Sequence, residues 1–352
     1  MKKIIPAAGL LLALQIVLAA ALHFGGDDTL QTPPDSPLFA FKAEAVTGLT
    51  ITDDNKGSIT LVKGDKGWTL PGTFDAPASA EQVKALLEKL AGLKQGLPVA
   101  TSEGAARRFK VADDLFQRHV ELREGDKVVA DLYIGTSPGF RQIHARKAGS
   151  QEVISVNLST FELETAADQW LDKKMFAVKE EDIAALVFPT FTLRRNGAEW
   201  QLDGLGEGEK TDATAAADLV AKVSGLTVQS VVAAETAAPF FAGEPALRFT
   251  VQRKEGGELI YTLAKGGEDA YYLQQSQLQH YGKVHKIQAE GLQKAGRDGL
   301  IAKTAGGAEA GAAQPAGTAA AGAGGEAAPV AAGAAQGEVP GAGQAEAQGA
   351  GK

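Results

Sequence analysis

The chain has 352 residues, a formal net charge of −8 and no cysteine. Its acidic balance, without a clustered Lys/Arg face, argues against nucleic acid as a partner and against charge-driven adhesion to anionic lipid. The lack of cysteine excludes disulfides, thiolate metal ligands, cysteine nucleophiles and an anchor built on a lipidated cysteine.

An apolar run from Ile4 to Phe24 follows two lysines at the N-terminus. As a helix it would be about 31 Å long, close to the hydrocarbon thickness of a bilayer. The positive flank predicts a cytoplasmic N-terminus and a periplasmic body, so residues 1–25 are interpreted as a single-pass anchor in the inner membrane. The run exceeds a typical cleavable core, which favours an uncleaved anchor. A signal peptide cleaved near the alanines at 19–21 is the alternative.

Composition and periodicity divide the rest of the chain. Residues 26–42 are polar and contain several prolines, and they are expected to form a linker. Residues 43–175 and 176–303 are predicted to be two α+β repeats. Residues 304–352 consist almost entirely of Ala, Gly, Pro, Gln and Glu. This composition predicts a disordered tail, because it offers too little apolar area to offset the ordering entropy.

The evidence for a repeat is a shared pattern around two tryptophans. Trp68 and Trp200 lie in short strand-like stretches about 132 residues apart, and each precedes a predicted helix. Both helices carry an apolar stripe at i, i+3, i+4 and i+7. The stripe residues are Val83, Leu86, Leu87 and Leu90 in the first repeat and Ala216, Leu219, Val220 and Val223 in the second. Ser79 and Gln82 predict the start of the first helix as a capping box.

Each repeat is predicted to contain three strands, a helix, four strands and a closing helix. Alternating apolar and polar residues joined by tight turns favour antiparallel sheet with one helix-covered face. The expected segments are strands 46–52, 58–63, 67–70, 119–123, 128–134, 140–146 and 152–156 with closing helix 159–170, then strands 247–253, 259–265, 270–275 and 283–287 with closing helix 290–303. The predicted fold class is α+β: two tandem copies of a mostly antiparallel sheet with covering helices, behind one N-terminal transmembrane helix.

The sequence predicts no catalytic residues, no metal site and no cofactor. Residues 135–139, Gly-Thr-Ser-Pro-Gly, match the G-x-S-x-G of a nucleophile elbow. Pro138, however, removes the N–H that an oxyanion hole needs, and a strand rather than a helix follows, so we predict a hairpin turn. No histidines have metalloprotease spacing, and the acidic pairs lack the ligand pattern of a calcium loop.

Four tyrosines of the second repeat are candidates for a partner or ligand surface. On adjacent strands their rings would line a groove or patch. Ordinary packing within the sheet is the alternative interpretation. The candidates are Tyr261, Tyr271, Tyr272 and Tyr281.

The chain resembles a known bacterial family. The resemblance is carried by a Leu-Thr-Ile strand at 49–51, a Gly-Trp-Thr-Leu strand at 67–70, the Leu-rich helix and the Leu-Tyr-Ile-Gly stretch at 132–135. These features resemble the family of the domain of unknown function 4340 over roughly residues 1–300. The resemblance implies a membrane-anchored protein with an exported body, encoded beside an ABC-type transporter and its gliding-motility-like auxiliary subunit. It implies no catalytic residues.

We therefore expect a non-enzymatic, membrane-anchored periplasmic accessory protein. Its expected partners are the permease of an ABC-type transporter or auxiliary envelope subunits. Two alternatives stay open. One is a periplasmic module that binds a glycan, lipid or peptide between the repeats. The other is an envelope hydrolase whose site the sequence does not reveal.

Overall fold

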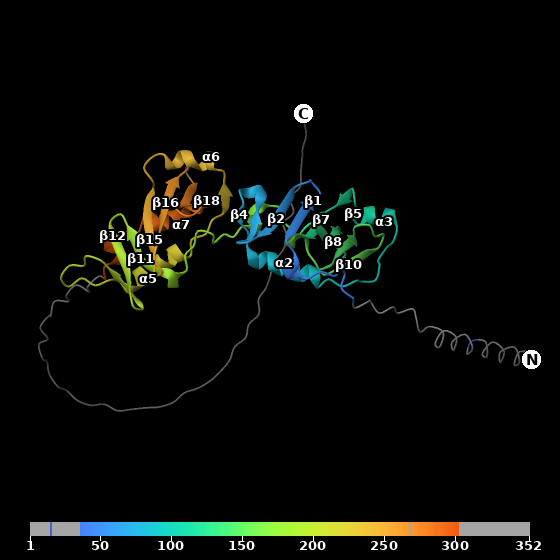
Figure 1. Ribbon diagram of the computed structural model, residues 1–352, viewed down its shortest axis with the longest axis horizontal. Coiled ribbons are helices and arrows are strands. Elements are labelled where there is room, and N and C mark those ends of the chain that lie inside the picture. The colour runs from blue at the N-terminus through green and yellow to red at the C-terminus, as the bar shows by residue number, and fades with distance from the viewer. Residues whose placement is uncertain (1–14, 16–35, 268, 303–352) are drawn as a thin grey trace, which may run out of the picture. The chain divides into compact units, whose positions relative to one another are not determined.

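The computed structural model describes residues 15, 36–267 and 269–302 (Figure 1). Apart from Gln15, the anchor predicted for residues 1–25 lies outside the described residues, and so does the tail predicted for residues 304–352. Within the described part of the chain, no helix is both long and apolar enough to cross a membrane.

The described residues form a mixed α+β protein with large antiparallel sheets and few helices. This confirms the fold class at that level. The helices are α2 (Ala80–Ala91), α3 (Glu103–Arg108), α4 (Ala167–Trp170), α5 (Ala213–Ser224), α6 (Ala234–Ala237) and α7 (Lys286–Gln293). The 3₁₀ turns are η1 (Ala43–Ala45), η2 (Pro71–Thr73), η3 (Thr160–Glu162), η4 (Glu180–Asp182), η5 (Ala238–Phe241) and η6 (Arg297–Leu300).

The first sheet has eight strands in the order β10-β9-β8-β7-β1-β2-β3-β4. Every neighbouring pair in it is antiparallel. The strands are β1 (Gly48–Asp53), β2 (Ser58–Gly64), β3 (Gly67–Leu70), β4 (Ala76–Pro77), β7 (Arg118–Glu124), β8 (Lys127–Ile134), β9 (Ile143–Lys147) and β10 (Val153–Val156). A separate two-stranded hairpin consists of β5 (Val111–Ala112) and β6 (Leu115–Phe116).

The second sheet has eight strands in the order β13-β12-β11-β15-β16-β17-β18-β14. Its neighbouring pairs are also antiparallel. The strands are β11 (Ile183–Phe188), β12 (Phe191–Asn196), β13 (Glu199–Leu202), β14 (Ser230–Val232), β15 (Leu247–Arg253), β16 (Glu258–Lys265), β17 (Tyr271–Gln275) and β18 (Tyr281–Val284).

Seven strands have the same neighbour order in both sheets. The run β10-β9-β8-β7-β1-β2-β3 in the first corresponds to β18-β17-β16-β15-β11-β12-β13 in the second. The eighth strand differs, because β4 lies beside β3 whereas β14 lies beside β18. At the place of β14, the first sheet has only an isolated bridge between Ala100 and Val153.

The two long helices begin with a side-chain cap and bury one stripe. Ser79 accepts a hydrogen bond from the backbone N–H of Gln82, and Asp212 accepts from those of Thr214 and Ala215. All eight predicted stripe residues are buried. The apolar periodicity of the sequence therefore located both helices correctly, since the buried face of a helix is set by its 3.6-residue period.

Four predicted segments differ from the structure. The closing helix expected at 290–303 is not continuous, because α7 begins earlier and ends at Gln293, and η6 follows it. The strand expected from residue 140 begins at Ile143, because a tight turn closed by a Gly139–Gln142 bridge comes before it. The strand expected at 283–287 ends at Val284, and α7 begins two residues later. The closing helix expected at 159–170 is divided into η3 and α4.

Candidate functional site

The four candidate tyrosines do not form one exposed surface. Tyr261 and Tyr271 are 0% and 4% exposed and belong to the hydrophobic core. The period-two alternation of a strand explains this, since Tyr271 and Tyr272 are adjacent and point to opposite faces of the sheet. The hydroxyl of Tyr261 donates a 2.8 Å hydrogen bond to the carbonyl oxygen of Phe176, which satisfies its polar atom inside the core.

The other two tyrosines are half-buried under a neighbouring turn. Phe240 packs on Tyr272 and Phe241 on Tyr281, with ring centroids 5.2 and 5.3 Å apart. These rings therefore serve mainly to hold η5 and α6 against the sheet. The part of the tyrosine surface that stays accessible is limited to Tyr272 and Tyr281.

A more organised polar site lies on the first sheet, on the face opposite α2. We call this the outer face. Part of it is covered by residues 100–117, which contain α3 and the β5–β6 hairpin and which we call the outer segment. A small second hydrophobic cluster joins the two, with Ala106, Val111, Ala112 and Val153 buried in it. The outer segment is therefore packed against the sheet rather than free in solvent.

Cross-strand pairing aligns the polar side chains of this face. His119 of β7 is directly opposite Tyr133 of β8, and Tyr133 is opposite Arg146 of β9. The His119 and Tyr133 rings stack with centroids 4.4 Å apart, and the Arg146 guanidinium lies 4.8 Å from the Tyr133 ring centroid. His119 Nε2 is also 2.6 Å from a carboxylate oxygen of Asp131. Neighbouring strands thus build one continuous row of interacting groups.

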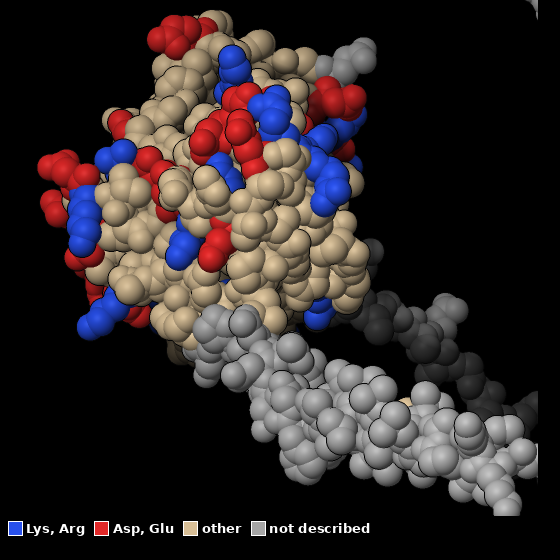
Figure 2. All heavy atoms as spheres, turned by 90° about the vertical axis from the view of Figure 1, so that its right-hand side faces the viewer, with Lys and Arg blue, Asp and Glu red and all other residues tan. Residues whose placement is uncertain are grey.

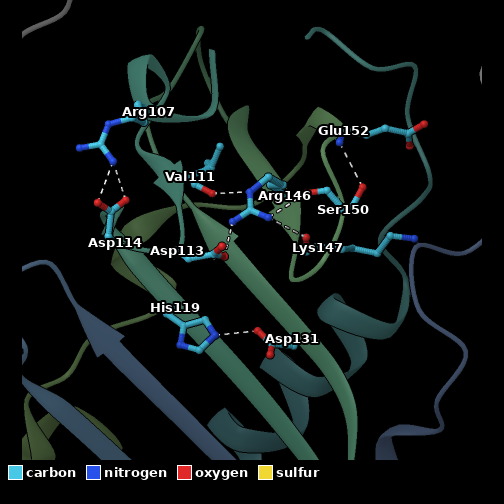
Figure 3. Close-up of polar contacts among 10 residues, drawn as sticks. All are labelled: Arg107, Val111, Asp113, Asp114, His119, Asp131, Arg146, Lys147, Ser150 and Glu152. Atoms are coloured by element: carbon cyan, nitrogen blue, oxygen red, sulfur yellow. Dashed lines mark hydrogen bonds and ion pairs between the residues drawn. The ribbon is translucent and has the colours of Figure 1, made fainter. Parts of the chain in front are cut away.

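Arg146 fixes the outer segment to the sheet (Figure 3). Its side chain is only 6% exposed. It donates to the carbonyl oxygens of Val111 and Ser150, at 2.6 and 2.8 Å, and to the carboxylate of Asp113 at 2.5 Å. A buried guanidinium needs such partners because leaving its charge unpaired would be costly.

A second guanidinium–carboxylate pair lies beside the first. Arg107 Nη1 is 2.7 Å from both carboxylate oxygens of Asp114. Both carboxylates face solvent more than their partners do: Asp113 is 73% exposed and Asp114 68% exposed. The two pairs border a hollow of about 510 Å³ between α3, the β5–β6 turn and the β9–β10 turn. Figure 2 shows acidic and basic side chains interspersed on this side of the molecule.

The electrostatics of the outer face keep Arg107, Asp114 and Tyr133 each in one charge state. Hydrogen bonding to Arg107 lowers the pKa of Asp114, and the same contact raises the pKa of Arg107. Burial, reinforced by the charges of Asp113 and Asp131, raises the pKa of Tyr133. All three pKa values move away from neutrality. The site therefore presents an ionised Asp114 carboxylate, which accepts hydrogen bonds and pairs with cations, and a neutral Tyr133 phenol.

The sequence contained only part of this site. Asp113-Asp114 is one of the acidic pairs of the sequence and lies in the β5–β6 turn, and the Gly-Thr-Ser-Pro-Gly segment is the predicted hairpin turn. The latter joins β8 to β9, and the hydroxyl of Ser137 lies 2.7 and 2.6 Å from the carbonyl oxygens of Gly139 and Gln142. The importance of Arg146 was missed, because one arginine in an alternating strand looks like an ordinary solvated residue. Within the described residues, no group of His, Asp and Glu has the arrangement of a metal site.

Comparison with known proteins gives one match. A family model described as "Domain of unknown function (DUF4340)" matches residues 68–245, about half of the chain. These residues include the outer segment and both guanidinium–carboxylate pairs. No curated protein and no solved structure matches the chain.

Proposed function

Because the chain belongs to the DUF4340 family, we propose that it is a non-enzymatic accessory protein of the bacterial envelope that acts by binding. Residues 4–24 would anchor it in the inner membrane, with the body in the periplasm. Its partners would be the permease of an ABC-type transporter or auxiliary subunits of the same envelope complex. The equal strand order of the two sheets supports an origin of the body by duplication behind that single anchor.

The observation that carries the binding role is the pair of positioned carboxylates on the outer face. Asp113 is held by a guanidinium that is itself held by three backbone carbonyl groups. Asp114 is held through both of its oxygens by Arg107. Recognition benefits from such groups, because a partner need not order them when it binds.

The charge states support binding over proton transfer. A general acid or base works best with a pKa near the operating pH. Here the pKa of Asp114 is lowered and the pKa of Tyr133 is raised, so neither group exchanges its proton readily near neutral pH. Within each pair the two charges balance, and the exposed carboxylate oxygens of Asp113 and Asp114 suit a partner surface that carries Lys, Arg or backbone N–H groups.

Co-purification from detergent tests this proposal. The full chain, tagged at its C-terminus, should retain a permease and an ATPase subunit that mass spectrometry identifies. The double variant Asp113→Asn, Asp114→Asn should reduce the recovered subunits about fivefold or more, because the rim loses both carboxylates and keeps the two arginine charges.

Asp203→Asn provides the matched control. Asp203 also pairs with an arginine at the surface, but it lies in the second repeat, next to β13. Recovery with this variant should equal that of the unchanged protein. If the unchanged protein retains no transporter subunits, the transporter association is wrong. If both variants bind equally well, the outer face is not the contact.

The hollow also favours a second function, the binding of a small ligand. Its volume of about 510 Å³ is within the range of pockets that hold small molecules. Its polar rim suits a hydroxyl-rich or amine-bearing group, such as part of a glycan or peptide, better than a lipid chain. Saturation-transfer NMR with envelope glycans and short peptides would detect such binding, and Asp113→Asn should reduce the signal.

A further inference from the structure

The first repeat has a groove beside its long helix, α2. The groove has a volume of about 400 Å³ and lies between α2 and the chain that contains η3 and α4. Leu86 and Trp170 form its buried floor, at 5% exposure each. Phe161 stands at its edge and is 84% exposed. An exposed aromatic ring beside an apolar hollow is a common feature of protein-binding surfaces.

The rim of the groove is polar and acidic. Lys89 Nζ lies 2.5 Å from a carboxylate oxygen of Glu162, so this pair carries no net charge. Glu164 also lines the groove, and its carbonyl oxygen accepts the indole N–H of Trp170 at 2.7 Å. Among the described residues, the carboxylate of Glu164 has no hydrogen-bond or ion-pair partner. The Glu164 carboxylate is therefore available to pair with a cationic group of a binding partner.

The second repeat indicates what fits in such a groove. Residues Leu86 and Lys89 of α2 correspond to Leu219 and Lys222 of α5, because the buried stripes of the two helices match. In both repeats, the segment after the last strand of the sheet ends with the same hydrogen bond to the start of the long helix. The N-cap N–H donates to the carbonyl oxygen of Trp170 in the first repeat and of Leu300 in the second.

In the second repeat, this segment contains a two-turn helix. It is α7, which packs on α5 and buries Ala289 and Leu292 at 1% exposure each. Gln288 fastens it by donating to the carbonyl oxygen of Gly225, just after α5. In the first repeat, only the single turn η3 occupies the corresponding stretch. The groove lies beside this shorter turn, lined by Leu86 of α2 and by Phe161 and Glu162 of η3.

We propose that this groove binds a short amphipathic helix of a partner protein, in the position that α7 has in the second repeat. The partner helix buries two apolar side chains one turn apart against Leu86, Phe161 and Trp170. A Lys or Arg beside them pairs with Glu164. The inference rests on the proposed binding function and names the chemistry of one contact.

Photo-crosslinking from the groove tests the inference in intact cells. In the full chain, Phe161 is replaced by the photoreactive analogue benzoylphenylalanine, which keeps an exposed aromatic side chain there. Crosslinked peptides should come from one amphipathic helical segment of another envelope protein. The same analogue at Phe140, which is 86% exposed in the β8–β9 turn, should not crosslink that segment.

A variant that fills the groove tests whether the crosslink depends on it. Ala85 lines the groove from an exposed position of α2, and Ala85→Arg fills the space without disturbing the helix. This change should reduce the Phe161 crosslink about tenfold. Ala221→Arg, at an exposed position of α5 outside the groove, is the matched control and should leave the crosslink unchanged.

Three results would overturn the inference. They are a crosslink that Ala85→Arg does not reduce, a crosslink only to a second copy of this chain or to lipid, and the same crosslinked proteins from Phe161 and Phe140. If the transporter subunits co-purify with the unchanged protein but Ala85→Arg does not reduce the crosslink, the groove contact is wrong while the accessory function stands. If nothing co-purifies with the unchanged protein, the function itself is wrong.

Discussion

At the scale of single residues, burial determines what a polar side chain does in this protein. Arg146 and Arg107 both pair with an aspartate, yet Arg146 is 6% exposed and Arg107 is 49% exposed. The buried guanidinium of Arg146 donates hydrogen bonds to three backbone carbonyl groups as well as to Asp113. Its role is therefore structural. The exposed pair is screened by water and contributes to the surface charge pattern.

Tyr261 illustrates the same rule and gives a prediction on pH dependence. Burial raises its pKa to about 12, above the usual value of 10. The phenol stays neutral in the folded protein, so its contribution to stability is complete below pH 10. That contribution is lost as the pH rises from the unfolded pKa through the folded one.

Tyr261→Phe should therefore lower the free energy of unfolding at pH 7 by about 1 kcal/mol, through the lost hydrogen bond to Phe176. It should also reduce the loss of stability between pH 10 and pH 12. Urea unfolding at several pH values measures both effects. An unchanged alkaline pH dependence in the variant would show that Tyr261 titrates as an exposed tyrosine does.

At the scale of elements, the outer segment depends on a close backbone approach at Gly135. A Cβ atom there would lie 1.9 Å from the carbonyl oxygen of Phe109 and 2.4 Å from that of Lys110. The N–H of Thr136 also donates to the Phe109 carbonyl oxygen at 2.8 Å. Only glycine allows the end of α3 to sit this close to the β8–β9 turn.

Gly135→Ala should consequently detach the outer segment while the sheet stays folded. Amide hydrogen exchange of residues 100–117 should become faster by at least tenfold, the effect of about 1.4 kcal/mol. Gly139→Ala, four residues later, is the control, because a Cβ atom there meets nothing within 4 Å. Equal exchange in the two variants would mean that the contact at Gly135 does not hold the segment.

The sequence predicted the long elements well and the short ones poorly. The stripes of α2 and α5 and the strands β15 and β16 are periodic over enough residues to identify them. The outer segment was missed because α3 and the β5–β6 hairpin are short, and their formation depends on packing against the sheet. The groove could not be predicted either, since it results from a difference between η3 and α7 that only three-dimensional alignment reveals.

At the scale of the whole molecule, both proposed binding surfaces lie where the two repeats differ. Seven strands and one long helix are common to both. The first repeat adds the β5–β6 hairpin with its charged hollow, and it has a groove beside α2, whereas α7 packs on α5 in the second. A duplicated scaffold can retain its core while one copy acquires binding surfaces.

The central claim is that this body works outside the cytoplasm, held to the inner membrane by residues 4–24. The most direct measurement is the activity of alkaline phosphatase fused after residue 302, because this reporter folds into an active enzyme only after export. We predict high activity in membranes and a loss of that activity when residues 4–24 are deleted. A fusion that is inactive while a cytoplasmic reporter at the same position is active would contradict both the envelope location and the proposed association with a transporter.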